Sequence, residues 1–258
     1  MYFQIQSYFN FLLKSQNQHG LHSPFVYDLV TNCFYDKEDH EGYKMIKDYR
    51  NDLLRNKKII EVTDFGAGSR VFKSNHRPVF SIAKNAGITL HRAKFLHRLT
   101  KYLNIRNALE LGTSLGIASS AIAANKSTEL TTIEGCPETA KIAQQQFHKY
   151  QLKNIDLEIG KFENQLEQIH QKKEKFDLVY FDGNHQTEAT LKYFETLVPS
   201  AHNDSVFIFD DIHWSKEMQE AWLEIIAHPE VQVSIDTFQW GLIFFRKEQV
   251  KQDFTIRL

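Results

Sequence analysis

The spacing of apolar residues along the chain changes near residue 105. Before that point they recur every three or four positions, which predicts helices joined by polar loops. The helices are expected over residues 1–13, after the Ser23-Pro24 start signal, and over residues 43–54 and 91–103. Within the first helix the spacing predicts the apolar stripe of an amphipathic helix, which consists of Ile5, Tyr8, Phe9 and Leu12.

From residue 107 onward, short apolar runs alternate with helical segments. The runs predict buried strands over residues 108–111, 130–133, 155–159, 176–181 and 205–209. One intervening helix begins at Pro137, a residue favoured in the first turn, and another ends before Pro199. Because neighbouring parallel strands must be joined by a crossover, usually a helix, this alternation predicts an α/β fold with a doubly wound, mostly parallel sheet.

The last part of the chain departs from this alternation. A helix is expected over residues 216–227, followed by two strands over residues 231–235 and 242–245. The segment between these strands is too short for a crossover helix, so they are expected to pair antiparallel. The predicted fold is therefore a Rossmann-like sheet of seven strands with an antiparallel last strand, preceded by a helical N-terminal extension.

Composition and charge narrow the class of protein. Hydrophobic residues make up 42% of the 258 positions, which is enough for a packed core and excludes a disordered chain. Lysine and arginine total 31 against 32 acidic residues, so the overall charge argues against nucleic acid or a membrane as partner. The basic side of the helix expected over residues 91–103 is interpreted as a solvated face. Two cysteines, Cys33 and Cys136, form neither a disulfide framework nor a metal motif, which favours a cytoplasmic location.

A glycine-containing turn follows the first predicted strand. It consists of Glu110, Leu111, Gly112, Thr113, Ser114, Leu115 and Gly116. Glycines at this place let the backbone turn tightly and approach a ligand. Glu134 ends the second strand, 24 residues after Glu110, and an acid there can hold the ribose hydroxyls of an adenosine ligand. Residues 64–69 form a second glycine motif without a following helix, which is either a turn or a lid over the site.

Three aspartates end the fourth and fifth predicted strands. Asp182 follows the fourth strand, and Asp210 and Asp211 follow the fifth. The carboxyl ends of neighbouring strands face the ligand crevice of a doubly wound sheet, and converging carboxylates favour a hard cation such as Mg²⁺ or Mn²⁺. The alternative is that these side chains cap a helix or open a turn.

These motifs resemble class I methyltransferases that use S-adenosylmethionine (SAM), in particular the metal-dependent O-methyltransferases of the catechol and caffeoyl-coenzyme A type and the bacterial sugar O-methyltransferases. The resemblance implies that Gly112 and Gly116, with Glu110, Thr113 and Ser114 around them, hold the methionine part of SAM. It implies that Glu134 binds the ribose, and that the turn at Gly160 and Lys161 borders the adenine. It makes Asp182, Asp210 and Asp211 the metal ligands, with Asp182 also at the cofactor, although catechol-type enzymes carry asparagine where Asp211 stands.

His185 lies three residues after Asp182, where the catechol-type enzymes place a lysine base and some sugar-modifying relatives place a histidine. A neutral imidazole can take the proton of an attacking hydroxyl, so His185 and Asp182 are the predicted catalytic residues. His213 is the second candidate base, and Trp214 is a candidate wall of the acceptor pocket.

The predicted function is methyl transfer from SAM to a hydroxyl of a small molecule, such as one of two vicinal hydroxyls, assisted by a divalent metal. Residues 105–258 would form the SAM-binding methyltransferase domain. Residues 1–104 would form a helical region that covers the acceptor or, as the resemblance implies, makes a homodimer. Two alternatives stay open: a metal-independent methyltransferase acting on nitrogen or a macromolecule, and a catalytically silent binding module. A nicotinamide dehydrogenase is disfavoured by the antiparallel terminal strands.

Overall fold

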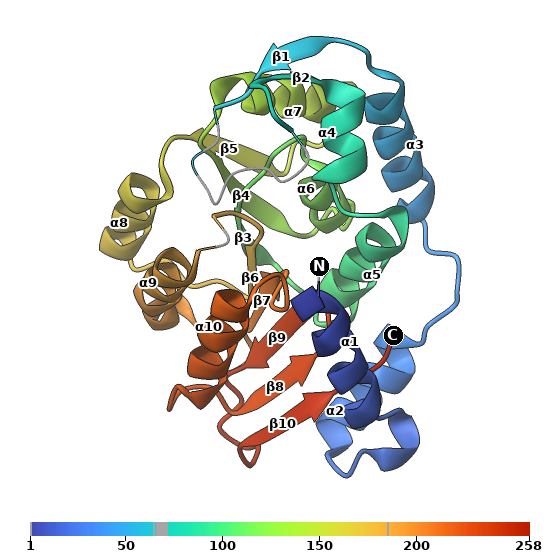
Figure 1. Ribbon diagram of the computed structural model, residues 1–258, viewed down its shortest axis with the longest axis vertical. Helices are drawn as coiled ribbons and strands as arrows, with labels where there is room; N and C mark the ends of the chain where they lie inside the picture. The colour runs from blue at the N-terminus through green and yellow to red at the C-terminus, as the bar shows by residue number, and fades with distance from the viewer. Residues whose placement is uncertain (1, 64, 66–71, 185) are drawn as a thin grey trace. The chain divides into compact units, whose positions relative to one another are not determined.

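The computed structural model describes residues 2–63, 65, 72–184 and 186–258. The chain forms two compact units, one of residues 37–167 and the other of residues 1–36 and 168–258, and the boundary falls within helix α8 (Phe162–Lys172) (Figure 1). The predicted helical region 1–104 is therefore shared between the units. Its first 36 residues fold with the C-terminal part of the chain, and the rest folds with the glycine turn.

The unit of residues 37–167 contains a parallel sheet. Strand β4 (Glu129–Glu134) pairs with β3 (Asn107–Leu111) on one side and with β5 (Ile155–Ile159) on the other. The crossovers are α6 (Ile117–Ala123) and α7 (Pro137–Lys149). Helix α3 (Gly42–Arg55) packs against α4 (Val79–Asn85), α5 (Leu90–Tyr102) and α6 (Figure 1). The predicted alternation of strands and helices is confirmed in this unit.

The same unit holds a small hairpin that the sequence did not predict. Strand β1 (Ile59–Glu61) pairs antiparallel with β2 (His76–Pro78). Each strand is three residues long, which is too short to produce a recognisable alternation. The Thr63 backbone N–H donates to Cys136 Sγ over 3.3 Å, so the hairpin is tied to the turn that follows β4.

Helix α5 shows that its predicted solvated basic face was wrong at two positions. His97 and Arg98 are both buried. Arg98 Nη1 donates to the Tyr43 hydroxyl over 3.0 Å, and His97 Nδ1 lies 3.2 Å from the carbonyl oxygen of Ala121. Burial lowers the pKa of His97 to about 4, so this imidazole is neutral and belongs to the packing of the unit.

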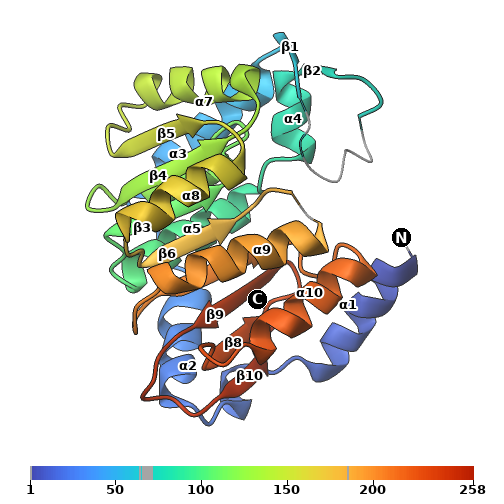
Figure 2. The ribbon, with the colours of Figure 1, turned by 90° about the vertical axis from the view of Figure 1, so that its left-hand side faces the viewer.

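The other unit contains a mixed sheet in the order β10-β8-β9-β7-β6. Strands β6 (Leu178–Phe181) and β7 (Val206–Asp210) are parallel, and β9 (Trp240–Phe244) is antiparallel to both β7 and β8 (Val233–Asp236). Helices α9 (Thr187–Leu197) and α10 (Lys216–Ala227) pack side by side (Figure 2). The predicted antiparallel terminal strands are confirmed. Strand β10 (Gln252–Thr255), parallel to β8, is additional, because its polar sequence contains no apolar run.

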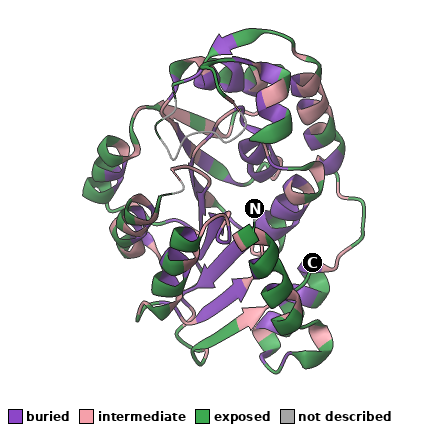
Figure 3. Cartoon of the chain, viewed as in Figure 1, coloured by how far each residue is buried: buried purple, intermediate pink, exposed green. Residues whose placement is uncertain are grey.

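Helix α1 (Tyr2–Lys14) is confirmed, but three of the four residues of its apolar stripe are exposed. Ser7 and Phe11 are buried, whereas Ile5, Tyr8 and Phe9 are exposed. Most of the helix is drawn as exposed in Figure 3. The two buried positions, Ser7 and Phe11, are not among those of the apolar stripe, so the spacing alone did not identify the inner face. It is followed by the short helices η1 (Gln18–Gly20), α2 (Pro24–Leu29) and η2 (Val30–Phe34). In the part of the chain that the structure describes, no helix has the length and hydropathy needed to cross a membrane.

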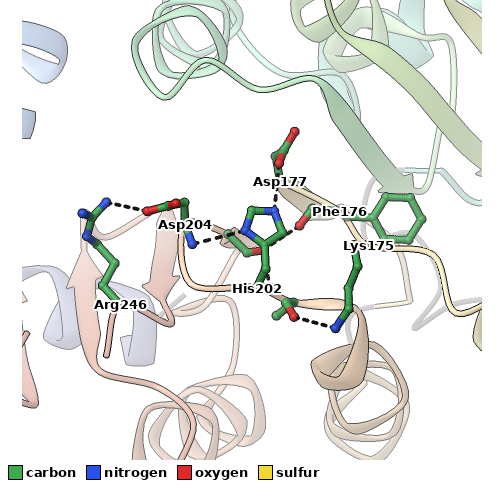
Figure 4. Close-up of polar contacts among 8 residues, drawn as sticks. Lys175, Phe176, Asp177, His202, Asp204 and Arg246 are labelled. Carbon is green, nitrogen blue, oxygen red and sulfur yellow. Dashed lines mark hydrogen bonds and ion pairs between the residues drawn. The ribbon is translucent and has the colours of Figure 1, made fainter. Parts of the chain in front are cut away.

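The segment between α9 and β7, which includes η3 (Val198–Ser200), is fixed by polar contacts at the start of β7 (Figure 4). His202 Nε2 lies 2.8 Å from Asp177 Oδ1, and His202 Nδ1 accepts from the Asp204 backbone N–H over 3.3 Å. Ser205 Oγ donates to the Phe176 carbonyl oxygen over 2.7 Å. Both ring nitrogens of His202 are therefore used to hold the turn.

Candidate functional site

The turn between β3 and α6 has the backbone conformation that its glycines predict. Gly112 has φ 104°, Ser114 has φ 48° and Gly116 has φ 75°, all in the left-handed region that glycine adopts at the lowest cost. The Gly112 N–H donates to the Ile133 carbonyl oxygen over 3.0 Å, which holds the turn against the end of β4. The chain thus turns sharply at the carboxyl end of a parallel strand, where ligands bind in sheets of this class.

Helix α3 supports this turn from behind. The Tyr49 hydroxyl donates to the Leu115 carbonyl oxygen over 2.9 Å, and its ring stacks on Phe147 of α7 at 6.3 Å. A Cβ atom added at Gly116 would lie 2.5 Å from Phe147 Cε1 and 2.6 Å from the Tyr49 oxygen. The turn is therefore closely packed against two rigid aromatic rings.

Glu134 lies at the end of β4 and contacts the glycine turn directly. Its Oε2 accepts from the Ser114 N–H over 2.7 Å, and its Oε1 accepts from the Cys136 N–H over 2.8 Å. Burial raises the pKa of this carboxyl, and the two backbone N–H groups oppose that rise. Each carboxylate oxygen has two lone pairs, so each can also accept a ligand hydroxyl.

Glu110 lies beneath the turn with its side chain fully buried. The Thr132 hydroxyl donates to Glu110 Oε2 over 2.5 Å, and the Ser119 hydroxyl donates to the same oxygen. Thr132 Oγ1 is also 2.6 Å from Thr113 Oγ1, which connects this carboxyl to the turn. Burial raises the pKa of Glu110 to about 7. The hydrogen bonds that the structure shows for Glu110 therefore stabilise the turn.

This raised pKa predicts a pH-dependent stability. Between pH 4.5 and about 7 the native protein holds a proton on Glu110 that the unfolded chain has lost, so stability falls as the pH rises through this window. The shift corresponds to roughly 3 kcal/mol. The Glu110→Gln side chain cannot ionise. The free energy of unfolding of the variant minus that of the wild type should therefore increase by about that amount from pH 5 to pH 8, as measured by urea unfolding. Replacing the exposed Glu129 by glutamine is the control, and an equal pH response in both variants would contradict the assignment.

The turns after β4 and β5 carry the other residues predicted to bind the adenosine. The Gly160 N–H donates to the Glu134 carbonyl oxygen over 2.9 Å, which brings the two strand ends together. Phe65 packs against Gly135, where an added Cβ would lie 2.7 Å from the Phe65 ring. Lys161 Nζ is 5.9 Å from the centre of that ring. Phe65 therefore lies beside the carboxylate that is expected to bind ribose, while Asp64 and residues 66–69 of the second glycine motif lie outside the described residues.

In the other unit, Asp210 ends β7 and is almost fully buried. Its Oδ1 accepts from the Asp211 N–H over 2.8 Å, and its Oδ2 accepts from the Tyr180 hydroxyl over 3.3 Å. Asp211 has φ 55°, so the chain turns sharply directly after the strand. Asp182 follows β6, the parallel neighbour of β7, and is half-buried.

The predicted metal set was tested against this geometry. Across residues 2–63, 65, 72–184 and 186–258, no three histidine, cysteine, aspartate or glutamate side chains lie in an arrangement that could hold a metal ion. Asp182, Asp210 and Asp211 therefore do not form a site from their own carboxylates in this arrangement. The predicted base His185 lies outside the described residues, so its role stays a prediction.

His213 lies three residues after Asp210 and pairs with a carboxylate at the end of β8. His213 Nε2 is 2.8 Å from Asp236 Oδ2, and Asp236 Oδ1 accepts from the Phe238 N–H over 2.7 Å. The Phe238 ring stacks on the imidazole at 5.1 Å with 16° between the planes. Trp214, the predicted wall residue, is half-buried next to this pair.

Comparison with known proteins agrees with the motifs. Residues 109–212 match the family model described as a methyltransferase domain. This part of the chain is therefore similar to methyltransferase domains. No curated protein matches the chain.

Solved structures of methyltransferases share the fold of this chain. An O-methyltransferase from Bacillus cereus in complex with SAH is 17% identical, with a TM-score of 0.54 over 85% of this chain and 96% of that one. The O-methyltransferase TomG from Streptomyces achromogenes, involved in tomaymycin synthesis and solved with SAM, is 15% identical, with a TM-score of 0.57 over 89% and 99%. The SAH-bound Podospora anserina methyltransferase PaMTH1 is 12% identical, with a TM-score of 0.60 over 87% and 97%. At these identities the likeness concerns the fold.

Sequence reasoning did not single out Tyr49, which supports the glycine turn, or Asp236, which pairs with His213. No local signal marks Tyr49, a buried aromatic in an amphipathic helix, whereas Phe65 lies within the second glycine motif that the sequence did identify. Asp236 carries the same signal as Asp210, because it directly follows a predicted strand. His19 and His22 are exposed, and His19 lies within η1, while the Ser23 hydroxyl caps α2 by accepting from the Val26 N–H.

Proposed function

We propose that the protein transfers a methyl group from SAM to a hydroxyl of a small molecule. The observation that carries this proposal is the contact between the Glu134 carboxylate and the backbone of the glycine turn at Ser114. A strand-end acid beside a tight glycine turn is the arrangement that binds a nucleoside ligand in Rossmann-like sheets. The neighbours solved with SAM or SAH, two of which are described as O-methyltransferases, support the choice of ligand and acceptor atom.

The residues of the glycine turn and Glu134 would hold the cofactor, whose sulfonium supplies an electrophilic methyl group. Glu134 offers lone pairs to the ribose hydroxyls, while Gly112 and Gly116 allow the backbone to approach the methionine part. The chain must then align the acceptor oxygen with the methyl carbon and remove the hydroxyl proton. His185 and Asp182 are the residues that the sequence predicts for this task.

That the acceptor is a small molecule is part of the proposal, because the comparisons concern the fold. The names of the structural neighbours include O-methyltransferases and a biosynthetic enzyme for tomaymycin, which favours a metabolite over a macromolecule. A vicinal diol or catechol is the acceptor class that the sequence predicts. No step of the proposed reaction is assigned to a metal, because the three aspartates do not form a ligand set in the described geometry.

The proposal is tested by calorimetric titration of the metal-stripped protein with SAM, followed by a turnover assay on catechol. We expect micromolar binding and formation of one SAH per methylated product. Binding without turnover on any diol would instead favour a silent binding module, and an absence of binding would overturn the cofactor assignment. Repeating both measurements with Mg²⁺ and with a chelator tests the sequence prediction of a metal. Turnover that a chelator removes and Mg²⁺ restores would confirm that prediction, and unchanged turnover would show that it was wrong.

A further inference from the structure

Two histidine–aspartate pairs in the unit of residues 1–36 and 168–258 have the same first contact but differ in the second. In each pair the histidine Nε2 lies 2.8 Å from an aspartate oxygen, Asp177 for His202 and Asp236 for His213. The second nitrogen of His202 accepts from the Asp204 backbone (Figure 4). The second nitrogen of His213 is buried and has no hydrogen-bond partner among the described residues. The first pair is complete within the chain, whereas the second leaves one polar atom unsatisfied.

The contact with Asp236 determines what that atom can do. An ionised carboxylate only accepts hydrogen bonds, so the hydrogen of a neutral His213 ring lies on Nε2. The lone pair is then on Nδ1, which is an acceptor that lacks a donor. A buried polar atom without a partner costs about 1–3 kcal/mol, and such atoms in native structures need an explanation, for example a catalytic role. A hydroxyl donor would satisfy Nδ1.

The two pairs also lie at opposite ends of β7. His202 precedes this strand, and His213 follows it at the carboxyl end, three residues after Asp210. Strand β8 runs parallel to β7, since both are antiparallel to β9, so Asp236 ends at the same edge of the sheet. The carboxyl edge of such sheets is where ligands bind. His213 thus combines the unsatisfied nitrogen with the expected location.

Aromatic side chains shield the His213 imidazole from water. His213 is 8% exposed and is covered by the ring of Phe238, which contacts Tyr8 and Phe11 of α1 at 4.8 and 5.5 Å between ring centres. Phe238 has φ 72°, a conformation that is costly for a bulky residue and is typical of functional sites. These rings limit the access of solvent to the imidazole.

We propose that His213 is the residue that takes the hydroxyl proton of the methyl acceptor, and that Asp236 positions it. The inference rests on the proposed function and names the base for it. The acceptor oxygen forms a bond to the methyl carbon, the carbon–sulfur bond breaks, and its electron pair stays on sulfur to give neutral SAH. The hydroxyl proton moves to His213 Nδ1, and the resulting imidazolium is stabilised by the Asp236 carboxylate before the proton passes to solvent.

The first test compares His213→Gln with the matched control His202→Gln, using catechol and 4-nitrocatechol as acceptors. A general base contributes about 10²–10⁴-fold, so kcat of His213→Gln on catechol should fall at least 100-fold while SAM affinity stays within about threefold. On 4-nitrocatechol, whose hydroxyl is far more acidic, the loss should shrink to below about tenfold. Asp236→Asn should show the same dependence on the acceptor, and His202→Gln should keep kcat. An equal loss on both acceptors, or a loss no larger than in His202→Gln, would overturn the proposal.

A second test does not depend on turnover. Nitrogen-15 NMR of the wild-type protein should show His213 with hydrogen on Nε2 and none on Nδ1. Addition of SAH and catechol together should shift the Nδ1 resonance, whereas both resonances of His202 should stay in place. Hydrogen on Nδ1, or an Nδ1 resonance unmoved when calorimetry shows that catechol is bound, would overturn the role of His213. If the wild-type protein binds SAM but neither binds nor methylates catechol, the proposed acceptor class is wrong. The position of the hydrogen on the His213 ring is then the measurement that supports or overturns the role of His213.

Discussion

Gly116→Ala is expected to lower the melting temperature of the protein by about 10 °C, the largest loss of stability among the glycine substitutions considered. The new Cβ would lie 2.5 Å from Phe147 Cε1 and 2.6 Å from the Tyr49 oxygen, and neither ring can move freely in its buried setting. Alanine at φ 75° adds a backbone penalty of about 1–2 kcal/mol, and overpacking adds about 1–3 kcal/mol. Thermal unfolding followed by circular dichroism measures the effect.

Gly160→Ala is the matched control for this prediction. Gly160 is another glycine at the end of a strand, but its φ is not in the left-handed region, and an added Cβ would approach the flexible end of Gln165 at 2.9 Å. The melting temperature should therefore change by less than about 3 °C. Equal effects at both positions would show that the packing behind the turn does not set its conformation. Calorimetry on both variants should also show weaker SAM binding for Gly116→Ala, because the displaced turn carries Ser114.

The strands were predictable from the sequence because buried parallel strands are continuous apolar runs. Residues 205–209 were expected as a strand and β7 covers Val206–Asp210, all five of them buried. The helix expected over residues 216–227 is α10 with the same bounds. The pattern of buried and exposed positions does not change along these elements, so the local sequence is enough to predict them.

Elements whose environment comes from distant residues were not predictable in this way. Helix α1 has apolar residues on most of its surface, and only its contact with Phe238 determines that Phe11 faces inward. Strand β10 has a polar sequence and exists because β8 offers it an edge. Ile256, which directly follows this strand, forms a β-bridge with Gln16, so segments from the first and last parts of the chain pair with each other. Phe11 and Phe238, like Gln16 and Ile256, are more than 200 residues apart, and no local pattern records these contacts.

The residues of the candidate site also differ in how far the local sequence could predict them. Glycine spacing and a strand-end acid identify Glu134 and the turn at residues 112–116, because the requirement lies in the local backbone. The support from Tyr49 and the pairing of His213 with Asp236 depend on which elements pack together. The metal site stays a prediction: strand order suggested convergence of three carboxylates, and the Asp210 carboxylate accepts from the Tyr180 hydroxyl and the Asp211 N–H.

Glu134→Ala should weaken SAM binding by at least 100-fold, the largest loss of affinity expected from a single substitution in the unit of residues 37–167. Hydrogen bonds to a charged group contribute about 1.5–3 kcal/mol each, and two ribose hydroxyls would be lost together. The substitution also leaves the Ser114 and Cys136 N–H groups without their acceptor, which loosens the turn. Isothermal titration calorimetry with SAM and SAH measures the change.

Glu129→Ala is the control, because Glu129 begins the same strand and is exposed. Its SAM affinity should match the wild type within about twofold, whereas Glu134→Gln should lie between wild type and Glu134→Ala since the amide keeps one acceptor oxygen. This graded order separates ribose binding from simple support of the turn. If Glu134→Gln bound SAM as tightly as wild type, the carboxylate charge would have no part in binding. If Glu134→Ala also bound normally, the ligand would have to contact the sheet elsewhere, and the cofactor assignment for the glycine turn would be wrong.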